Sequence, residues 1–256
     1  MNVQLPQPSR RDIYGRRARI GYTCPPLCAE IFPYEFYKVV PEGVTLVITT
    51  MCVIKRSRRE VDEAYEMSMR AACELAAAGV DIVFLGGVPV NLSRGHGGAQ
   101  ELMHTQLLRT LAAELGCKVS SSVAAQEKAA RTLGCRNVVI AHPYGEDEDA
   151  RLAADAERYG CKVHGVIGWG EVITRFGRIP AHAALDMGRE LMRRCPQADA
   201  MFFPSPHWPV LGAIDVLERE FGINVMAASQ SCIWDALRLA GVDDRISGCG
   251  RLLREF

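Results

Sequence analysis

The chain has 256 residues, which is long enough for two compact lobes of roughly 100–150 residues each. Hydrophobic residues make up 48% of it and charged residues 23%, a balance typical of a soluble globular protein. The 30 basic and 30 acidic side chains cancel, so the sequence offers no electrostatic basis for binding nucleic acid or an anionic membrane.

The N-terminal segment and the cysteines indicate a cytoplasmic protein. Residues 1–19 are polar and rich in arginine, without the apolar core of a signal peptide, and no later run approaches the roughly 20 apolar residues of a membrane helix. The 10 cysteines of such a chain predict reduced thiols, not disulfides. Cys24 and Cys28 form the only close pair in the sequence, so we expect no metal site.

Short apolar segments recur along the chain and predict β-strands. Several are continuously apolar, as in Ile82–Leu85 and Val138–Ala141, which is typical of strands buried on both faces of a parallel sheet. In chain order, we predict strands over Arg19–Cys24, Val44–Cys52, Asp81–Gly87, Lys118–Ser122, Asn137–His142, Val163–Trp169, Ala200–Pro204 and Asn224–Ala228.

Longer amphipathic segments separate these strands and predict helices. Arg59–Ala78 carries apolar residues at helical spacing and stops at Gly79. The basic run Arg56–Arg59 is interpreted as a solvated helix start, and the acidic run Glu146–Asp149 as a complement to a helix dipole. The other predicted helices are Ala99–Leu115, Ala124–Leu133, Glu146–Tyr159, Ala181–Arg194, Val210–Phe221 and Ser231–Ala240.

Strict alternation of strands and helices predicts parallel sheets with helices on both faces. The two halves echo each other, because Asp81–Gly87 and Asp199–Ser205 each follow a helix and enter a loop with proline and a polar ring or amide. We therefore predict an α/β fold of two Rossmann-like (flavodoxin-like) lobes, each with about four parallel strands, related by a pseudo-twofold axis. The expected division is residues 1–117 with 228–256, and residues 118–227, with the active site in the cleft between them.

The predicted fold also places the site. Ligands of open α/β sheets bind beyond the carboxyl ends of the strands. The sequence has no Walker A motif, no dinucleotide-binding glycine run after a strand and no hydrolase nucleophile elbow, which disfavours a nucleotide site. One site should be faced by the loops that follow Cys24, Gly87, Ser122, His142, Ser205 and Ala228.

Several short motifs occur in a fixed order along nearly the whole chain. They are Arg19–Pro26, Pro41–Gly43, Gly86–Gly87 with Ser93–Gly95, Ala141–Tyr144, Asp199–Ser205, Ser231–Ala236 and Gly248–Leu253. Each motif is weak alone. Their collinearity between Arg19 and Arg254 resembles the arylmalonate decarboxylase/maleate isomerase branch of the aspartate/glutamate racemase superfamily.

The resemblance implies an enzyme of two Rossmann-like lobes that needs no metal or coenzyme. Racemases of this superfamily carry a cysteine from each lobe, on opposite faces of the substrate α-carbon. The decarboxylase keeps only the second cysteine and cradles one carboxylate with backbone amides and hydroxyls. This chemistry is physically reasonable, because a carbanion beside a carboxylate needs hydrogen-bond donors and an acid of moderate pKa, such as a thiol.

The sequence departs from this pattern at both cysteine positions, which by the resemblance fall on Gly87 and Ser205. A hydroxyl is a far weaker acid than a thiol, so two-thiol racemisation is not expected. The hydroxyl side chains expected just after Gly87 are replaced by Val88 and Pro89. Tyr144 stands at the position of the family's carboxylate-binding tyrosine.

The candidate catalytic residues are Ser205, His207 and Tyr144. Ser205 could be a nucleophile or a hydrogen-bond donor, with His207 in the same loop or His142 at a strand end as its partner. Each residue has an alternative role. Ser205 could be an inert loop serine, and His207 could cap a turn beside Trp208. His142 could form hydrogen bonds at a strand end, and Tyr144 could face the surface.

A second group of residues is expected to bind the substrate. It comprises Pro25, Gly87, Val88, Pro89, Asn91, Tyr144, Pro206 and Cys232. Cys232 opens a predicted helix whose dipole should lower its pKa, which makes it the best candidate for a displaced thiol acid. Arg94 could clamp a carboxylate, and Cys24 lies beside the expected cleft; the alternatives are a solvated arginine and a packed cysteine.

Three functions remain open from the sequence. The first is a cofactor-independent enzyme acting at a carbon α to a carboxylate of a small (di)carboxylic acid, as a decarboxylase or a cis–trans isomerase or hydratase. The second is a hydrolase or lyase that uses Ser205 with a histidine, and the third is a non-catalytic carboxylate-binding protein with the same cleft. The aromatic loop Phe32–Tyr37 could be a lid or a subunit contact, and its apolar character favours a homo-oligomer.

Overall fold

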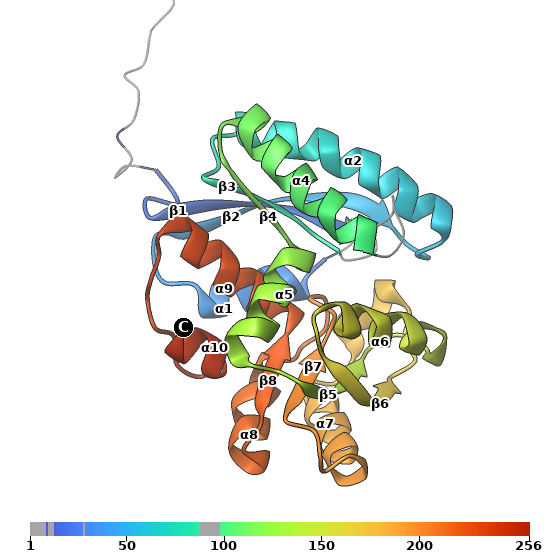
Figure 1. Cartoon of the computed structure of the whole chain (residues 1–256). Helices are drawn as coiled ribbons and strands as arrows, with labels where there is room; N and C mark the ends of the chain where they lie inside the picture. The colour runs from blue at the N-terminus through green and yellow to red at the C-terminus, as the bar shows by residue number, and fades with distance from the viewer. Residues whose placement is uncertain (1–8, 10–12, 28, 88–97) are drawn as a thin grey trace, which may run out of the picture.

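The strands form two separate parallel sheets with the same internal order. The computed structural model describes residues 9, 13–27, 29–87 and 98–256, and for residues 98–103 the backbone only. The first sheet has the order β2-β1-β3-β4 and the second β6-β5-β7-β8 (Figure 1). Within each half this is the 2-1-3-4 order of flavodoxin-like folds. The predicted α/β class and the two four-stranded sheets are confirmed.

The first sheet lies between two layers of helices. Its strands are β1 (Ala18–Pro26), β2 (Val44–Val53), β3 (Ile82–Leu85) and β4 (Lys118–Ser121). The helices α2 (Arg58–Ala77) and α4 (Gly98–Leu115) cover its outer face, at the top of Figure 1. The opposite face packs against α9 (Ala228–Ala240). All four residues of β3 are buried, because the strand is central in the sheet and covered on both faces.

The second sheet repeats this arrangement. Its strands are β5 (Asn137–His142), β6 (Lys162–Gly168), β7 (Ala200–Phe203) and β8 (Asn224–Ala227). The helices that flank it are α5 (Ser122–Leu133), α6 (Asp149–Arg158), α7 (Ala183–Arg194) and α8 (Leu211–Phe221). Two 3₁₀ helices, Glu146–Glu148 and Ile173–Arg178, follow β5 and β6. Each of the predicted strands and helices is present, with ends that differ by a few residues.

The helix α9 joins the two halves. It packs against α5 and α1 and contacts strands of both sheets, as its central position in Figure 1 shows. Every residue from Ala228 to Leu237 is buried. A helix with buried residues on all sides belongs inside a molecule, so α9 is a shared core element and not a surface helix of one lobe.

The predicted division of the chain differs from the structure at residue 118. The strand β4 pairs with β3, with Ile82 opposite Lys118 and Leu85 opposite Ser121, so it belongs to the first sheet. The boundary drawn before this strand is therefore wrong by one strand. The reason is physical: β4 completes a β-α-β crossover with β3 and α4, and the chain leaves the first sheet only afterwards, through α5.

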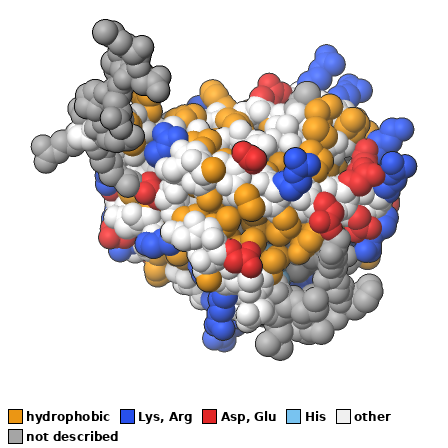
Figure 2. Space-filling model, turned by 90° about the horizontal axis from the view of Figure 1, so that it is seen from above, with side chains coloured by type: hydrophobic (Ala, Val, Ile, Leu, Met, Phe, Trp, Pro, Cys, Tyr) orange, Lys and Arg blue, Asp and Glu red, His pale blue; other side chains and the backbone are white. Residues whose placement is uncertain are grey.

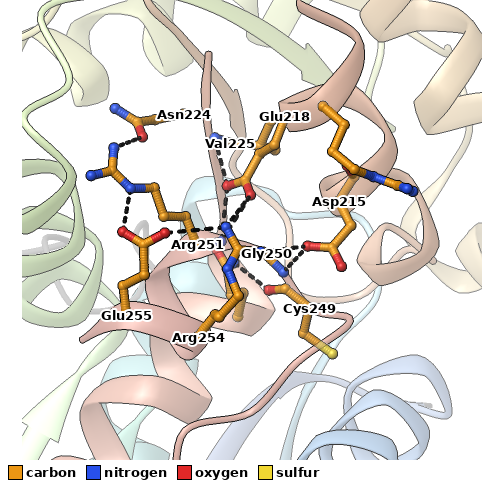
Figure 3. Close-up of polar contacts among 11 residues, drawn as sticks. Asp215, Glu218, Asn224, Val225, Cys249, Gly250, Arg251, Arg254 and Glu255 are labelled. Carbon is orange, nitrogen blue, oxygen red and sulfur yellow. Dashed lines mark hydrogen bonds and ion pairs between the residues drawn. The ribbon is translucent and has the colours of Figure 1, made fainter. Parts of the chain in front are cut away.

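The C-terminal helix α10 (Arg251–Glu255) docks on α8. Glu218 accepts the backbone N–H of Arg251 at 2.9 Å, and Asp215 accepts that of Gly250 at 2.8 Å (Figure 3). Carboxylates at the first amides of a helix satisfy orphan donors and stabilise its N-terminus. The last residues of the segment 228–256, expected in the first lobe, are thus anchored on a helix that flanks the second sheet.

The aromatic segment near residue 35 is a helix, not a loop. The helix α1 (Ile31–Val39) begins without a side-chain cap and has Pro33 in its first turn, where a missing N–H costs little. It buries Phe32 and Phe36 and exposes Tyr34 and Tyr37. The prediction of a loop was wrong. The segment lacks the capping residue that usually marks the start of a helix, and only one face of the helix is buried.

The surface carries charges of both signs. On the face shown in Figure 2, Lys and Arg side chains are interspersed with Asp and Glu, and hydrophobic side chains lie between them. Among the described residues, no helix combines the length and the apolar character that crossing a membrane requires.

Candidate active site

A pocket lies where the carboxyl ends of the two sheets meet. Its empty volume is about 660 Å³, a figure that includes the open solvent at its mouth. The first sheet and its following segments contribute Pro25, Pro26, Val53, Arg56, Val61, Gly87, Ser122 and Gln126. The second contributes Tyr144, Arg151, Leu152, Asp155, Tyr159, Ile173, Phe202, Pro204, Pro206 and His207. Gly87 and the loop around Ser205 therefore meet at one cavity.

Glycines shape the wall that follows β3. The N–H of Gly86 donates to the carbonyl oxygen of Thr23 at 3.0 Å, and a Cβ at residue 86 would lie 2.1 Å from that oxygen. Gly87 has φ of 81°, a backbone conformation that favours glycine. Its N–H donates to Ser122 Oγ at 3.1 Å. The strand end is thus held at close range, and no side chain at residue 87 fills the pocket.

Ser122 is a site residue that the sequence did not single out. It is buried, opens α5 and lines the pocket. Besides the N–H of Gly87, its Oγ accepts the thiol proton of Cys232 at 3.6 Å. The available signal was its place at the end of the predicted strand Lys118–Ser122, in a run that it shares with Ser120 and Ser121. Only the tertiary structure distinguishes Ser122 from these neighbours.

The buried thiols are poor acids. Burial raises the pKa of Cys232 to about 12, and it raises that of Cys24 to about 12 as well. The expectation that a helix dipole lowers the pKa of Cys232 is wrong, because Cys232 lies beyond the first turn of α9 and is only 1% exposed. Neither cysteine is among the residues that line the pocket.

Ser205 lies directly behind the wall formed by its neighbours Pro204, Pro206 and His207. It is fully buried and is not itself a lining residue. Its Oγ accepts the phenolic proton of Tyr144 at 3.3 Å and the backbone N–H of His207 at 3.4 Å. Ser205 therefore positions Tyr144 and the loop.

His207 lines the pocket with an unsatisfied ring. Neither ring nitrogen has a hydrogen-bond partner among the described residues, and the residue is only 7% exposed. The ring lies at an edge angle to Phe32, with the centroids 6.4 Å apart. Burial lowers the pKa of His207 to about 3, so the imidazole is neutral near pH 7. Buried polar groups without partners are rare, which makes this ring a candidate to contact a ligand.

His142 supports the site from behind. Its ring is fully buried, and Nε2 lies 2.7 Å from Asp149 Oδ1. Burial lowers the pKa of His142 more strongly than Asp149 raises it. The ring packs near Tyr144, with centroids 5.9 Å apart, but His142 is not a lining residue. The described side chains thus contain no pairing of Ser205 with a histidine ring.

Arg56 is the second site residue that sequence reasoning missed. The interpretation of Arg56 as part of a solvated helix start is wrong, because its side chain is 13% exposed and lines the pocket. Its guanidinium lies 4.2 Å from the centroid of the Tyr144 ring, and Nη1 lies 2.9 Å from Glu148 Oε1. The acidic run Glu146–Asp149 also does more than complement a dipole, since Glu148 pairs with Arg56 and Asp149 with His142.

Four predicted binding residues lie outside the described part of the chain: Val88, Pro89, Asn91 and Arg94. Within the described residues, no group of three or more His, Cys, Asp and Glu side chains is placed to hold a metal ion. The predicted residues that the structure brings to the pocket wall are Pro25, Gly87, Tyr144, Pro206 and His207.

The chain is similar to known proteins in both sequence and structure. The chain is 28% identical over 223 residues to an arylmalonate decarboxylase from Bordetella bronchiseptica, covering 85% of this chain and 82% of that protein. A liganded double mutant of arylmalonate decarboxylase has a similar structure, with a TM-score of 0.82 and 24% identity over 93% of this chain and 100% of that chain. A maleate isomerase variant from Pseudomonas putida with maleate reaches a TM-score of 0.80 at 21% identity, over 93% and 97% of the chains.

These structural similarities concern the fold, and the family assignment rests on the sequence. The family model described as arylmalonate decarboxylase matches residues 20–253, from the first strand to the last helix. The chain therefore belongs to the arylmalonate decarboxylase family.

Proposed function

We propose that this protein is a cofactor-independent enzyme that acts at a carbon α to a carboxylate of a small carboxylic acid, as a decarboxylase or a cis–trans isomerase. Its family and the pocket between the two sheets support the reaction class. The observation that carries the proposal is His207, a buried, neutral imidazole at the pocket wall with both ring nitrogens unpartnered among the described residues.

Ser122 and Tyr144 are the proposed donors to the substrate carboxylate. Ser122 Oγ accepts hydrogen bonds from the N–H of Gly87 and the thiol of Cys232, so its hydroxyl donates its own hydrogen bond elsewhere. Tyr22 is the neighbour that competes with a substrate carboxylate for this hydrogen bond. The phenol of Tyr144 is held near the pocket by its long, 3.3 Å bond to Ser205. Negative charge that develops on the carboxylate as an enediolate forms is stabilised by such prearranged donors.

His207 is the proposed proton carrier. When the acid binds, the neutral imidazole can take up a proton from solvent. The imidazolium then lies beside an anion, which raises its pKa from the value that burial imposes. In a decarboxylation, the C–C bond to one carboxylate breaks, carbon dioxide leaves, the bonding electron pair passes into the remaining carboxylate as an enediolate, and the imidazolium donates its proton to the α-carbon.

The geometry does not support the hypothesis of a serine hydrolase. Ser205 contacts the backbone N–H of His207, whereas the His207 ring has no described partner and His142 is paired with Asp149. A nucleophilic serine needs a base within hydrogen-bond reach of its hydroxyl. We therefore assign Ser205 a positioning role.

The test is turnover in D₂O. The full chain is incubated with a panel of small mono- and dicarboxylic acids, and NMR follows deuterium incorporation at the α-carbon, loss of carbon dioxide and cis–trans conversion. The unsubstituted protein should turn over at least one acid. His207→Ala should lower the rate roughly 100-fold, the typical contribution of a general acid or base.

His182→Ala is the matched control, because His182 has a side chain that is 70% exposed. It should match the unsubstituted protein. If acids raise the melting temperature but none is turned over, the protein is a binder and the proposal fails. Labelling of Ser205 by a serine-directed phosphonate would instead support the hydrolase.

A further inference from the structure

We propose that Arg56 determines substrate specificity by anchoring a second carboxylate of the substrate. This inference rests on the proposed function, since it names the side chain in the same pocket that would distinguish a dicarboxylic acid from a monocarboxylic one. The sequence alone does not indicate this role, because Arg56 belongs to an ordinary basic run before a helix.

The contacts of the guanidinium leave donors for a ligand. Its central carbon lies over the ring of Tyr144, 4.2 Å from the centroid, in a cation–π contact that does not require an N–H hydrogen bond. Nη1 pairs with Glu148 at 2.9 Å. A guanidinium has five N–H donors in one plane, more than a single ion pair requires. The edge of the group can therefore bind a carboxylate within the pocket that Arg56 lines.

The described charged side chains that line the pocket favour an anion. They are two cations, Arg56 and Arg151, and one anion, Asp155. Glu148, which pairs with both arginines, is not a lining residue. The neutral His207 adds no charge. Because charge interactions are strong in a partly buried site, a carboxylate of a ligand is attracted to this wall of the pocket.

The backbone at Arg56 is held in an unusual conformation. Its φ is 56°, in the left-handed region that a residue with a side chain rarely adopts. The carboxylate of Glu60 accepts the N–H of Lys55 at 2.8 Å and that of Ser57 at 3.3 Å, on both sides of Arg56. Such strain gathers at functional sites, where the surrounding structure imposes a position on a side chain.

The alternative is that Arg56 only ties the start of α2 to Glu148. Binding measurements separate the two roles. The probes are maleate and isocrotonate, which share a cis double bond and one carboxylate and differ by a carboxylate in place of a methyl group. Isothermal titration compares the unsubstituted protein with Arg56→Gln and with Arg56→Lys, which keeps the charge but loses the planar fork.

The unsubstituted protein should bind maleate about tenfold more tightly than isocrotonate. Arg56→Gln should abolish this preference and leave the isocrotonate affinity within about twofold, while Arg56→Lys should keep part of it. Arg58→Gln is the control, because Arg58 is two residues away and 71% exposed. Glu148 retains Arg151 as a partner in the Arg56 variants, so they should fold.

Two results would overturn the inference in distinguishable ways. Equal binding of both acids by the unsubstituted protein, or equal weakening of both by Arg56→Gln, would give Arg56 a structural role and leave the proposed function intact. Absence of binding of both acids would overturn the inference, and absence of turnover across the acid panel in D₂O would refute the proposed function as well. Tyr144→Phe identifies the carboxylate site common to both ligands, and it should weaken both acids together.

Discussion

At the scale of single residues, burial decides the protonation of the site. It raises the pKa of Cys232 and Cys24 to about 12 and lowers that of His207 to about 3. The thiols therefore stay protonated and the imidazole stays neutral near pH 7. The acid and base of the proposed chemistry must come from a group whose pKa a bound anion can shift, and His207 fits this condition.

The buried His207 makes stability depend on pH. An unfolded chain binds a proton at this residue below its ordinary pKa of 6.5, whereas the folded state binds it only near pH 3. Stability is thus lost as the pH falls from about 6.5 toward 3, by at most about 1.4 kcal/mol per pH unit for one proton. In urea unfolding curves at successive pH values, His207→Gln should lose less stability over this window than the unsubstituted protein. His182→Gln should follow the unsubstituted protein, and a parallel pH dependence of His207→Gln would refute the assignment.

At the scale of elements, the start of α2 fixes one wall of the pocket. Ser57 is its N-cap and accepts the N–H of Glu60, while Glu60 accepts the N–H groups of Ser57 and Lys55. This capping box satisfies donors at the helix N-terminus and at the same time holds both neighbours of Arg56. A local helix signal therefore positions a residue of the tertiary site.

Glu60→Ala should affect stability and specificity together. Loss of the capping box should destabilise the protein by about 1 kcal/mol, measured by urea unfolding. Because Arg56 is then less firmly held, the preference for maleate over isocrotonate should fall severalfold. Glu63→Ala serves as the control, since Glu63 is on the same helix, pairs with Arg59 and is 56% exposed. An unchanged preference in Glu60→Ala would show that Arg56 needs no such support.

At the scale of the whole molecule, a buried carboxylate links the two halves. Glu35 of α1 is 4% exposed and accepts the backbone N–H groups of Val210 at 2.9 Å and Leu211 at 3.1 Å, where α8 begins. Burial raises the pKa of this carboxyl despite these two bonds. Phe32, one turn earlier, contacts His207, so the same helix supports the pocket.

Replacing Glu35 should separate its acceptor role from its charge. Glu35→Ala should cost about 1–3 kcal/mol of unfolding free energy, because two buried amides lose their acceptor. Glu35→Gln keeps an acceptor and should cost less. Since the folded pKa is raised, the contribution of Glu35 is fully present below its unfolded pKa and declines as the pH rises through the folded value, so Glu35→Gln should gain relative stability toward high pH. Equal losses for both variants across pH would contradict this account.

The sequence by itself determined the elements and their order. Continuous apolar runs such as Ile82–Leu85 predicted central strands, and glycines after helical patterns predicted where helices end, because both depend on neighbours along the chain. Collinear motifs indicated the family. Residues at five of the six expected strand ends line one cavity, since parallel strands direct their carboxyl ends to one edge, whereas the described residues after Ala228 do not line it.

Only the tertiary structure decided which side chains meet at the pocket. Arg56 meets Glu148 and Tyr144, Ser122 meets Gly87 and Cys232, and none of these contacts follows from local periodicity. Burial and charge pairing depend on segments far apart in the chain, and they set both the pKa of His207 and the exposure of Arg56. For this reason the sequence did not show that Arg56 is largely buried, or that burial raises the pKa of Cys232.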